Sequence, residues 1–193
     1  MDFVNLFFNN LREDIIAHVP PDHRNKAAIS WMCVYLKIIM LSRGFHLILI
    51  YRITHLLRCN FGVLGKICSS ILFAFSRQWY SSEISPLANI AGGIIFPHPR
   101  NITIGAETII GPRSWIFQNV TIGGSPGKVG LPIIGSDGRI YTGAVISGPI
   151  KIGNHVSIGA NTVVSQDLAD GVFARPGKPT ISKSSQYSLD VAS

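Results

Sequence analysis

One histidine in this chain lies where the local sequence pattern changes. His98 stands between Pro97 and Pro99 in the stretch GGIIFPHPRNITIG, residues 92–105. Each proline fixes its own φ angle, and Pro99 also disfavours a helical conformation at His98. An imidazole, whose ordinary pKa is about 6.5, exchanges protons near neutral pH and suits the work of a general base. The alternative is a surface histidine in a turn, and the residues alone leave both interpretations open.

The pattern that changes at His98 is a repeat of six residues. Ile84, Ile90 and Phe96 are six apart; the next step is eight, and the spacing of six resumes at Ile104 and holds for ten repeats. A repeat of fixed period indicates a solenoid, here of short strands joined by tight turns. Glycine often follows the aliphatic residue, where we expect the backbone to turn sharply. The two extra residues should therefore push a rigid bulge carrying His98 out of the coil.

The N-terminal residues follow a helical spacing instead. Apolar residues recur through Leu36, Ile39 and Met40 and again beyond Leu47, and "SRG" (42–44) and "CNFG" (59–62) are expected breaks before a third helix over 63–78. The sequence predicts an α+β protein with an α-helical domain over 1–80, a solenoid over 81–172 and a tail over 173–193. Within the solenoid, residues 123–133 are polar and rich in glycine and proline, which predicts a loop that leaves the coil and returns.

Composition excludes several classes of protein. Of the 193 residues 47% are hydrophobic and 14% are charged, which excludes a disordered chain. Three cysteines without paired spacing suggest buried, reduced thiols rather than a disulfide framework, and no metal site is expected. The net charge is +7, and residues 1–80 carry nine Lys and Arg against four Asp and Glu. This basic half would face an anionic membrane or an acidic partner, or be a plain basic surface; no nucleic-acid-binding signature appears.

The apolar stretch of residues 29–57 raises the question of a membrane span. Lys37, Arg43, His46 and Arg52 interrupt it, so that no run approaches the roughly 18 uncharged residues of a spanning helix. The first residues also lack the charge pattern of a secretory signal. We therefore expect a cytoplasmic protein whose N-terminal helices pack together or touch the inner face of the membrane.

Several segments together resemble a known family. The hexapeptide repeat is similar to that of left-handed parallel β-helix proteins, most of which are acyltransferases. The carbonic anhydrases of that group need three zinc-binding histidines, whereas only His98 and His155 occur in the repeat region. "GFHLILIYRITHLL" (44–57), "EISPLANIAGGIIFPH" (83–98), "NVTIGG" (119–124) and "IKIGNHVSIGANTVV" (150–164) resemble segments of the serine acetyltransferases in the same order. The resemblance covers about residues 30–180.

The resemblance implies roles for particular residues. It places His98 at the general base that deprotonates the acceptor hydroxyl, and Glu83 at the carboxylate that orients this base. Acetyl-CoA would lie in the groove between coils of neighbouring subunits. Residues matching its binding site are Gly123, Gly124, Thr142, Gly143, Gly159 and Ala160, with Arg175 or Lys178 pairing with a phosphate. The family implies a homotrimer. Its fuller members pair trimers through a longer helical domain, and for this shorter one a dimer of trimers stays open.

Departures from the family pattern concern the acceptor. The family's loop motif Arg-His-Pro is Gly130-Leu131-Pro132 here, and Pro97 replaces the acid before the catalytic histidine. A zwitterionic amino acid needs charged partners in its site. We therefore expect acetyl transfer to a sugar hydroxyl in bacterial surface polysaccharide synthesis, with serine O-acetyltransfer and a non-catalytic trimeric scaffold as alternatives. Candidate sugar contacts, each also explicable as a solvated or packing side chain, are Arg100, Asn101, Trp115 and Gln118.

Overall fold

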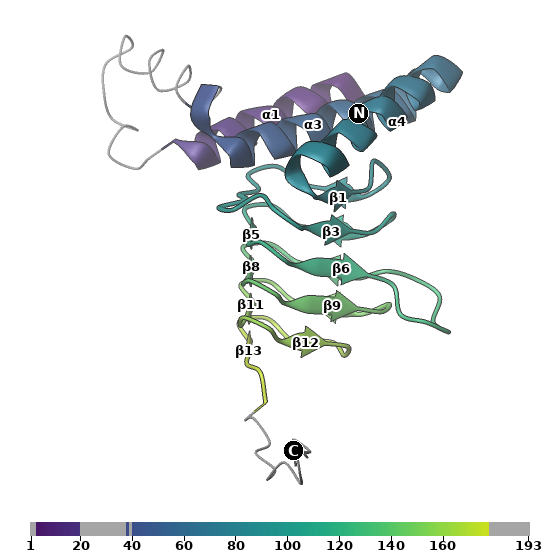
Figure 1. The fold of residues 1–193 in the computed structure, drawn as a ribbon. Coiled ribbons are helices and arrows are strands. Elements are labelled where there is room, and N and C mark those ends of the chain that lie inside the picture. Colours follow the sequence, from purple (N-terminus) through teal and green to yellow (C-terminus); the bar gives the residue numbers. More distant parts are fainter. Residues whose placement is uncertain (1–2, 20–37, 39, 178–193) are drawn as a thin grey trace, which may run out of the picture.

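A computed structural model describes residues 3–19, 38 and 40–177 (Figure 1). Three of its helices, α1 (Phe3–His18), α3 (Arg43–Asn60) and α4 (Gly62–Tyr80), lie across one end of a solenoid. Ser42 begins α3 as its N-cap, because its side chain accepts a hydrogen bond from Phe45 N at 3.2 Å. The predicted breaks at 42–44 and 59–62 are confirmed. The helical spacing at Leu36 and Ile39 lies outside the described residues.

The solenoid consists of thirteen short strands that form three parallel sheets. The first sheet has the order β1 (Glu83–Ile84), β3 (Thr103–Ile104), β6 (Thr121–Gly123), β9 (Val145–Ser147) and β12 (Val163–Val164). The second has β2 (Asn89–Ile90), β4 (Ile109–Ile110), β7 (Ile133–Ile134) and β10 (Lys151–Ile152). The third has β5 (Trp115–Ile116), β8 (Arg139–Ile140), β11 (Ser157–Ile158) and β13 (Phe173–Ala174). The predicted architecture, helices followed by a parallel β-helix, is confirmed.

The aliphatic residue of each repeat points into the solenoid and stacks on its equivalent one coil away. Ile84 pairs in register with Ile104, Ile104 with Ile122 and Ile122 with Ile146, and all four side chains are buried. The register also locates the insertion, since Ile104 follows Ile84 by twenty residues and Ile122 follows Ile104 by eighteen. The first coil is therefore longer by two residues, and His98 is exposed within it as predicted.

The glycines that follow the aliphatic residues have a different cause from the one we expected. None of them has a positive φ angle, so a sharp turn does not require them. A Cβ on Gly111 would lie 2.6 Å from the carbonyl carbon of Gly135, and one on Gly135 would lie 2.8 Å from that of Gly153. These glycines let adjacent coils approach closely. The left-handed corners are instead occupied mostly by polar residues such as Asn101, at φ 53°.

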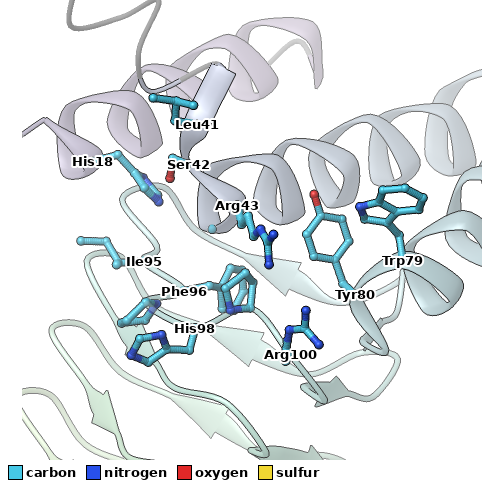
Figure 2. Close-up of a pocket in the computed structure, with 13 residues that line it drawn as sticks. His18, Leu41, Ser42, Arg43, Trp79, Tyr80, Ile95, Phe96, His98 and Arg100 are labelled. Atoms are coloured by element: carbon cyan, nitrogen blue, oxygen red, sulfur yellow. The ribbon is translucent and has the colours of Figure 1, made fainter.

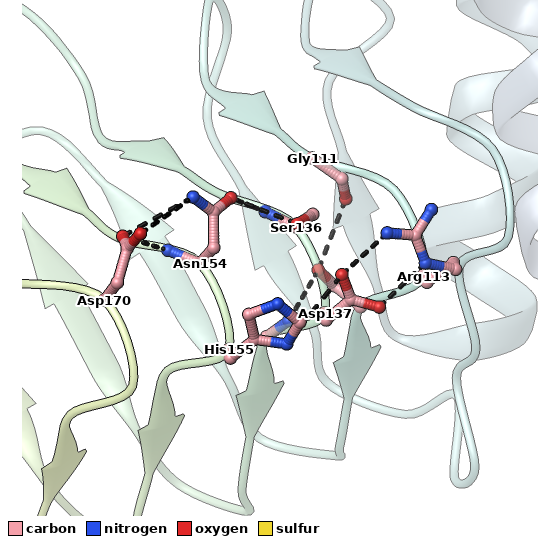
Figure 3. Close-up of polar contacts among 9 residues, drawn as sticks. Gly111, Arg113, Ser136, Asp137, Asn154, His155 and Asp170 are labelled. Carbon is pink, nitrogen blue, oxygen red and sulfur yellow. Dashed lines mark hydrogen bonds and ion pairs between the residues drawn. The ribbon is translucent and has the colours of Figure 1, made fainter.

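A ladder of polar side chains follows one corner of the solenoid (Figure 3). The Arg113 guanidinium donates two hydrogen bonds of 2.7 Å to the Asp137 carboxylate in the next coil. This bidentate contact holds the pKa of Asp137 below its usual range. Asp170 accepts a hydrogen bond from Asn154 N at 2.8 Å in a similar way. His155, predicted to lie on the surface, is exposed on this corner.

Buried polar contacts join the helices to the first coil. Arg52 on α3 donates from Nε to the Asp14 carboxylate on α1 at 2.9 Å, and from Nη2 to the Ala91 carbonyl at 2.6 Å. Asp14 in turn accepts a hydrogen bond from Ile94 N at 3.1 Å. Burial raises the pKa of Asp14, and the Arg52 guanidinium opposes that shift. The ion pair between Arg52 and Asp14 therefore joins α1 and α3 to the first coil of the solenoid.

Other expectations about the chain have mixed outcomes. The segment between β6 and β7 leaves the coil, as predicted, and Val129 on it is 98% exposed. The expectation that the cysteines are buried was wrong for Cys59, which is exposed at the end of α3, and Cys68 is half-buried. Cys33 lies outside the described residues. None of the described helices is long and apolar enough to cross a membrane.

Candidate active site

One corner of the solenoid brings together most of the residues that the sequence singled out. This corner, called the His98 corner below, comprises residues 97–101, 117–119, 141–143 and 159–161 of successive coils. Hydrogen bonds link its levels: Asn119 N donates to the Arg100 carbonyl at 3.1 Å, and Gly143 N donates to the Gln118 carbonyl at 3.2 Å. The third link joins Asn161 N to the Thr142 carbonyl at 2.9 Å. Residues far apart in sequence therefore form one continuous column.

An open cleft of about 660 Å³ lies where the His98 corner meets the helices (Figure 2). The insertion contributes Pro97, His98, Pro99 and Arg100, while the start of α3 contributes Ser42, Arg43 and Gly44. Trp79 and Tyr80, the last two residues of α4, border the same space. The cleft thus combines two histidines, two guanidinium groups and three aromatic side chains, and no Asp or Glu lines it among the described residues.

His98 is the proton-accepting side chain best placed in this cleft. Its imidazole is exposed and forms no hydrogen bond with any described side chain. The predicted partner, Glu83 on β1, is engaged elsewhere, because Arg77 Nε lies 2.9 Å from its Oε1. In this structure the two predicted catalytic residues are therefore not joined.

Arg43 and Arg100 supply positive charge to the cleft. Neither guanidinium forms a hydrogen bond or ion pair with a described residue, and both point into the space beside His98 (Figure 2). Tyr80 lies next to them, and burial raises the pKa of its phenol while Arg43 opposes the shift. Two unpaired guanidinium groups on one side of a cleft suit a carboxylate or another anion.

His18, at the end of α1, adds a hydrogen-bond acceptor. Burial lowers the pKa of its imidazole and so favours the neutral form. Its Nδ1 lies 2.8 Å from the Asp14 carbonyl, so this nitrogen carries the proton and donates it. The other nitrogen, Nε2, is buried beside Gly44 without a partner among the described residues. A bound molecule with an N–H or O–H group would satisfy it.

The remaining candidates for acceptor binding do not line the cleft. Asn101 is held by the solenoid, since its Nδ2 donates to Asn119 Oδ1 at 3.1 Å. Trp115 lies on the outer face of β5 with the Arg139 guanidinium 5.6 Å from its ring centre. Gln118 is half-buried, and its Oε1 has no partner among the described residues. Of the four predicted residues only Arg100 lines the cleft.

The residues predicted to hold acetyl-CoA divide into two groups. Thr142, Gly143, Gly159 and Ala160 lie on the His98 corner, below the cleft. Gly123 and Gly124 lie at the next corner, where the loop leaves the coil, and the Gly124 carbonyl accepts a hydrogen bond from Ser147 Oγ at 3.0 Å. Arg175 lies past the last strand with its guanidinium 4.9 Å from the Phe173 ring. Lys178 lies outside the described residues.

Sequence reasoning missed the helical side of the cleft. His18, Arg43, Trp79 and Tyr80 come from three helix ends and meet His98 only in the folded chain. The one available signal was position, because Arg43 directly precedes the "GF" that opens the segment resembling the serine acetyltransferases. Spacing within the repeat carries no information about these residues.

Comparison with known proteins identifies the family. The serine acetyltransferase of Bacillus subtilis (strain 168) is 31% identical over 191 residues, which cover 96% of this chain and 83% of that protein. One from Helicobacter pylori (strain ATCC 700392 / 26695) is 34% identical over 151 residues, covering 76% of this chain and 86% of the relative. The chain belongs to the serine acetyltransferase family. No protein-family model matches it.

Solved serine acetyltransferases share the fold. The enzyme from Neisseria gonorrhoeae in complex with serine has a TM-score of 0.74 at 26% identity, over 91% of this chain and 69% of that one. A serine acetyltransferase in complex with CoA has a TM-score of 0.72 at 28% identity, over 88% of this chain and 66% of that one. Within the described residues of the present family member, no cluster of His, Cys, Asp and Glu has the arrangement of a metal site.

Proposed function

We propose that the chain is an acetyl-CoA-dependent serine O-acetyltransferase with His98 as its general base. The family relationship supports acetyl transfer to a hydroxyl group, and two relatives that span most of the chain are named for serine. The observation that carries the choice of serine is the cleft itself. It holds His98 together with Arg43 and Arg100, so the positive charges that a serine carboxylate needs are present although the loop motif is not.

The chemistry is direct transfer within a complex of both substrates. His98 removes the proton of the serine hydroxyl, and the hydroxyl oxygen forms a bond to the acetyl carbonyl carbon. The carbon–sulfur bond then breaks, and the thiolate of CoA takes the proton back from the imidazolium. Backbone amides of the His98 corner would stabilise the negative charge on the thioester oxygen. No cysteine occurs after residue 68, so we assign no covalent enzyme intermediate.

Residues of the helices and of the insertion would give serine a defined orientation. Arg43 and Arg100 would bind the carboxylate, and the unpartnered Nε2 of His18 would accept a hydrogen bond from the ammonium group. The pantetheine arm would follow the small residues Thr142, Gly143, Gly159 and Ala160 along the His98 corner. We propose a homotrimer in which a neighbouring subunit covers this groove, as the family resemblance implies.

Transfer to a sugar hydroxyl is the second candidate. It is favoured by Gly130-Leu131-Pro132 in the loop, by Pro97 before the histidine, and by the lack of any carboxylate among the cleft residues described. Within the part of the chain that the structure describes, the ammonium group of serine would have no carboxylate partner in the cleft. Tyr80 would offer an aromatic face to a sugar ring in its place.

The decisive experiment measures release of the CoA thiol from acetyl-CoA in the presence of L-serine or of a panel of neutral sugars. We expect release with serine and none above background with the sugars. The opposite result would replace serine by a sugar hydroxyl, and a chain that fails to bind acetyl-CoA would be a scaffold rather than an enzyme.

A matched pair of variants tests the role of the guanidinium groups. Arg100→Gln should raise the KM for serine by about 10- to 100-fold, because it removes a charge-assisted hydrogen bond to the carboxylate. Arg12→Gln, on the exposed surface of α1, is the control and should leave the KM unchanged. An unchanged KM in Arg100→Gln would remove this residue from the serine site.

A further inference from the structure

Helix α4 presents its small residues to the protein and its large apolar residues to the outside. Gly65, Ser69 and Ser76 are its buried positions, together with Tyr80 at its end. The large apolar side chains on the opposite side are between 48% and 76% exposed: Val63, Leu64, Ile67, Ile71, Phe75 and Trp79. We call these six residues the α4 stripe. A helix that only packs on its own chain has the reverse arrangement.

The small residues are needed for close packing between α3 and α4. A Cβ on Gly65 would lie 2.2 Å from the Leu57 carbonyl oxygen, and Ser69 Oγ donates to the Thr54 carbonyl at 2.9 Å. This close contact fixes which side of α4 faces inward. The α4 stripe is therefore turned away from the core and contributes nothing to it.

The length and composition of the stripe indicate a surface that becomes covered. It runs along nearly all of Gly62–Tyr80, a helix of 19 residues. At 1.5 Å per residue the apolar face is about 25 Å long. At its C-terminal end Phe75 and Trp79 stack, with ring centres 5.8 Å apart. Single exposed apolar residues are common, but a continuous apolar face of this length marks an interaction site.

The charges on α4 indicate the sign of the charge that its partner carries. Helix α4 itself carries two cations, Lys66 and Arg77, and no Asp or Glu. Lys66 lines a shallow hollow on α4 with Val63, Ile67 and Ile71, so its ammonium group borders the apolar face directly. The positive charge of Arg77 is offset by the carboxylate of Glu83, with which it forms an ion pair. An apolar face edged by positive charge complements a surface that is apolar inside and negative outside.

We propose that the α4 stripe docks this protein on an anionic lipid surface, with the helix lying flat in the headgroup layer. The aliphatic residues would enter the acyl region, Trp79 would lie at the headgroup level, and Lys66 would reach lipid phosphates. The helices lie across the end of the solenoid, so the coils would extend away from α4 (Figure 1). This proposal is independent of which hydroxyl compound is acetylated.

A second copy of the chain fits the stripe less well. Two stripes facing each other would bring together helices whose charged residues, Lys66 and Arg77, are all cations, and α4 offers no carboxylate to pair with them. The cations would repel one another in such a contact, because an apolar interface has a low dielectric constant. The lipid surface has no such cost, because its charge is of the opposite sign.

Vesicle co-sedimentation of the full chain tests the proposal. We expect binding to vesicles that contain phosphatidylglycerol, weaker binding at high ionic strength, and little binding to vesicles of phosphatidylcholine alone. Ile71→Ser should lower the partition coefficient by about tenfold, since it removes one buried aliphatic side chain. Lys66→Glu should lower it by about fivefold or more on the anionic vesicles.

The control is Val163→Ser on the solenoid, where the native side chain is 69% exposed against 64% for Ile71. It should bind vesicles as the wild type does, and all three variants should keep the wild-type melting temperature. Equal binding to both kinds of vesicle, or none to either, would overturn the proposal. So would a loss of molecular mass in Ile71→Ser measured by light scattering without lipid, because that result assigns the stripe to a second copy.

Discussion

At the scale of single residues, His98 owes its position to its two neighbours. Pro97 and Pro99 stiffen the two-residue insertion, and the imidazole consequently projects from the coil into the cleft. The broken repeat made this residue visible in the sequence. Its surroundings were not visible, because Arg43 and Tyr80 come from helices that follow another periodicity.

Replacing His98 by alanine should lower kcat for acetyl transfer by about 10²- to 10⁴-fold, the usual contribution of a general base. The melting temperature should not change, because the side chain is exposed and has no described partner. The measurement is CoA thiol release together with a thermal melt. His155→Ala, on another exposed corner, serves as the control and should keep full activity. Wild-type turnover in a folded His98→Ala protein would exclude the assignment.

Glu83 shows the limit of transferring a role by sequence position. It occupies the expected place fifteen residues before His98, yet its carboxylate pairs with Arg77, a residue of α4. The partner depends on where the helix ends relative to β1, and no pattern within either segment contains that information. Its role in orienting His98 therefore stays a prediction.

At the scale of elements, the six-residue repeat predicts the solenoid because each aliphatic residue has one equivalent per coil. The same repeat gave a wrong expectation for glycine, because the glycines after the aliphatic residues do not occupy the sharp turns. The corners use residues such as Asn101, Asn119 and Asn161 with φ between 53° and 59°, and asparagine tolerates this conformation better than most residues. Gly111 and Gly135 instead stand where the backbones of two coils touch, and a single repeat does not reveal such a contact.

This difference gives a test with two glycines at the same repeat position. Gly111→Ala should destabilise the protein, since the added carbon would lie 2.6 Å from the Gly135 backbone. Overpacking of this kind costs about 1–3 kcal/mol. For a chain of this size that lowers the melting temperature by about 3–10 °C. Gly105→Ala places its carbon 3.5 Å from the nearest atom and should leave the melting temperature nearly unchanged. Equal effects in a calorimetric comparison would contradict this explanation.

At the scale of the whole molecule, residues 44–57, one of the segments that resemble the family, join its two parts. Tyr51 donates from its hydroxyl to the Ala88 carbonyl at 2.7 Å and accepts from Ile90 N at 3.1 Å. Burial raises the pKa of Tyr51 to about 12, which keeps the donating proton in place. Arg52 adds the ion pair with Asp14 and bonds to the first coil. The sequence shows these residue types, but only the fold shows that they dock helices on the solenoid.

The junction should make helices and solenoid unfold together, and Arg52→Met should weaken that coupling. Removing the guanidinium leaves Asp14 buried without its cation, a loss of about 3–5 kcal/mol. The melting temperature should fall by roughly 10 °C or more. Arg58→Met, near the end of the same helix, is the control and should change it little. Hydrogen exchange read by mass spectrometry should show α1 and α3 opening before the coils in Arg52→Met, and together with them in the wild type.

The pH dependence of that variant follows from its buried carboxyl group. Burial already raises the pKa of Asp14 above its value in the unfolded chain, and loss of Arg52 raises it further. A carboxyl with a raised pKa in the folded state destabilises the protein when it is ionised and ceases to do so once protonated. The stability difference between Arg52→Met and wild type should therefore be largest at alkaline pH and shrink as the pH falls through the pKa of Asp14. Melting both proteins over a pH series measures this difference, and a gap that widens toward acid would mean that Asp14 is not buried behind Arg52.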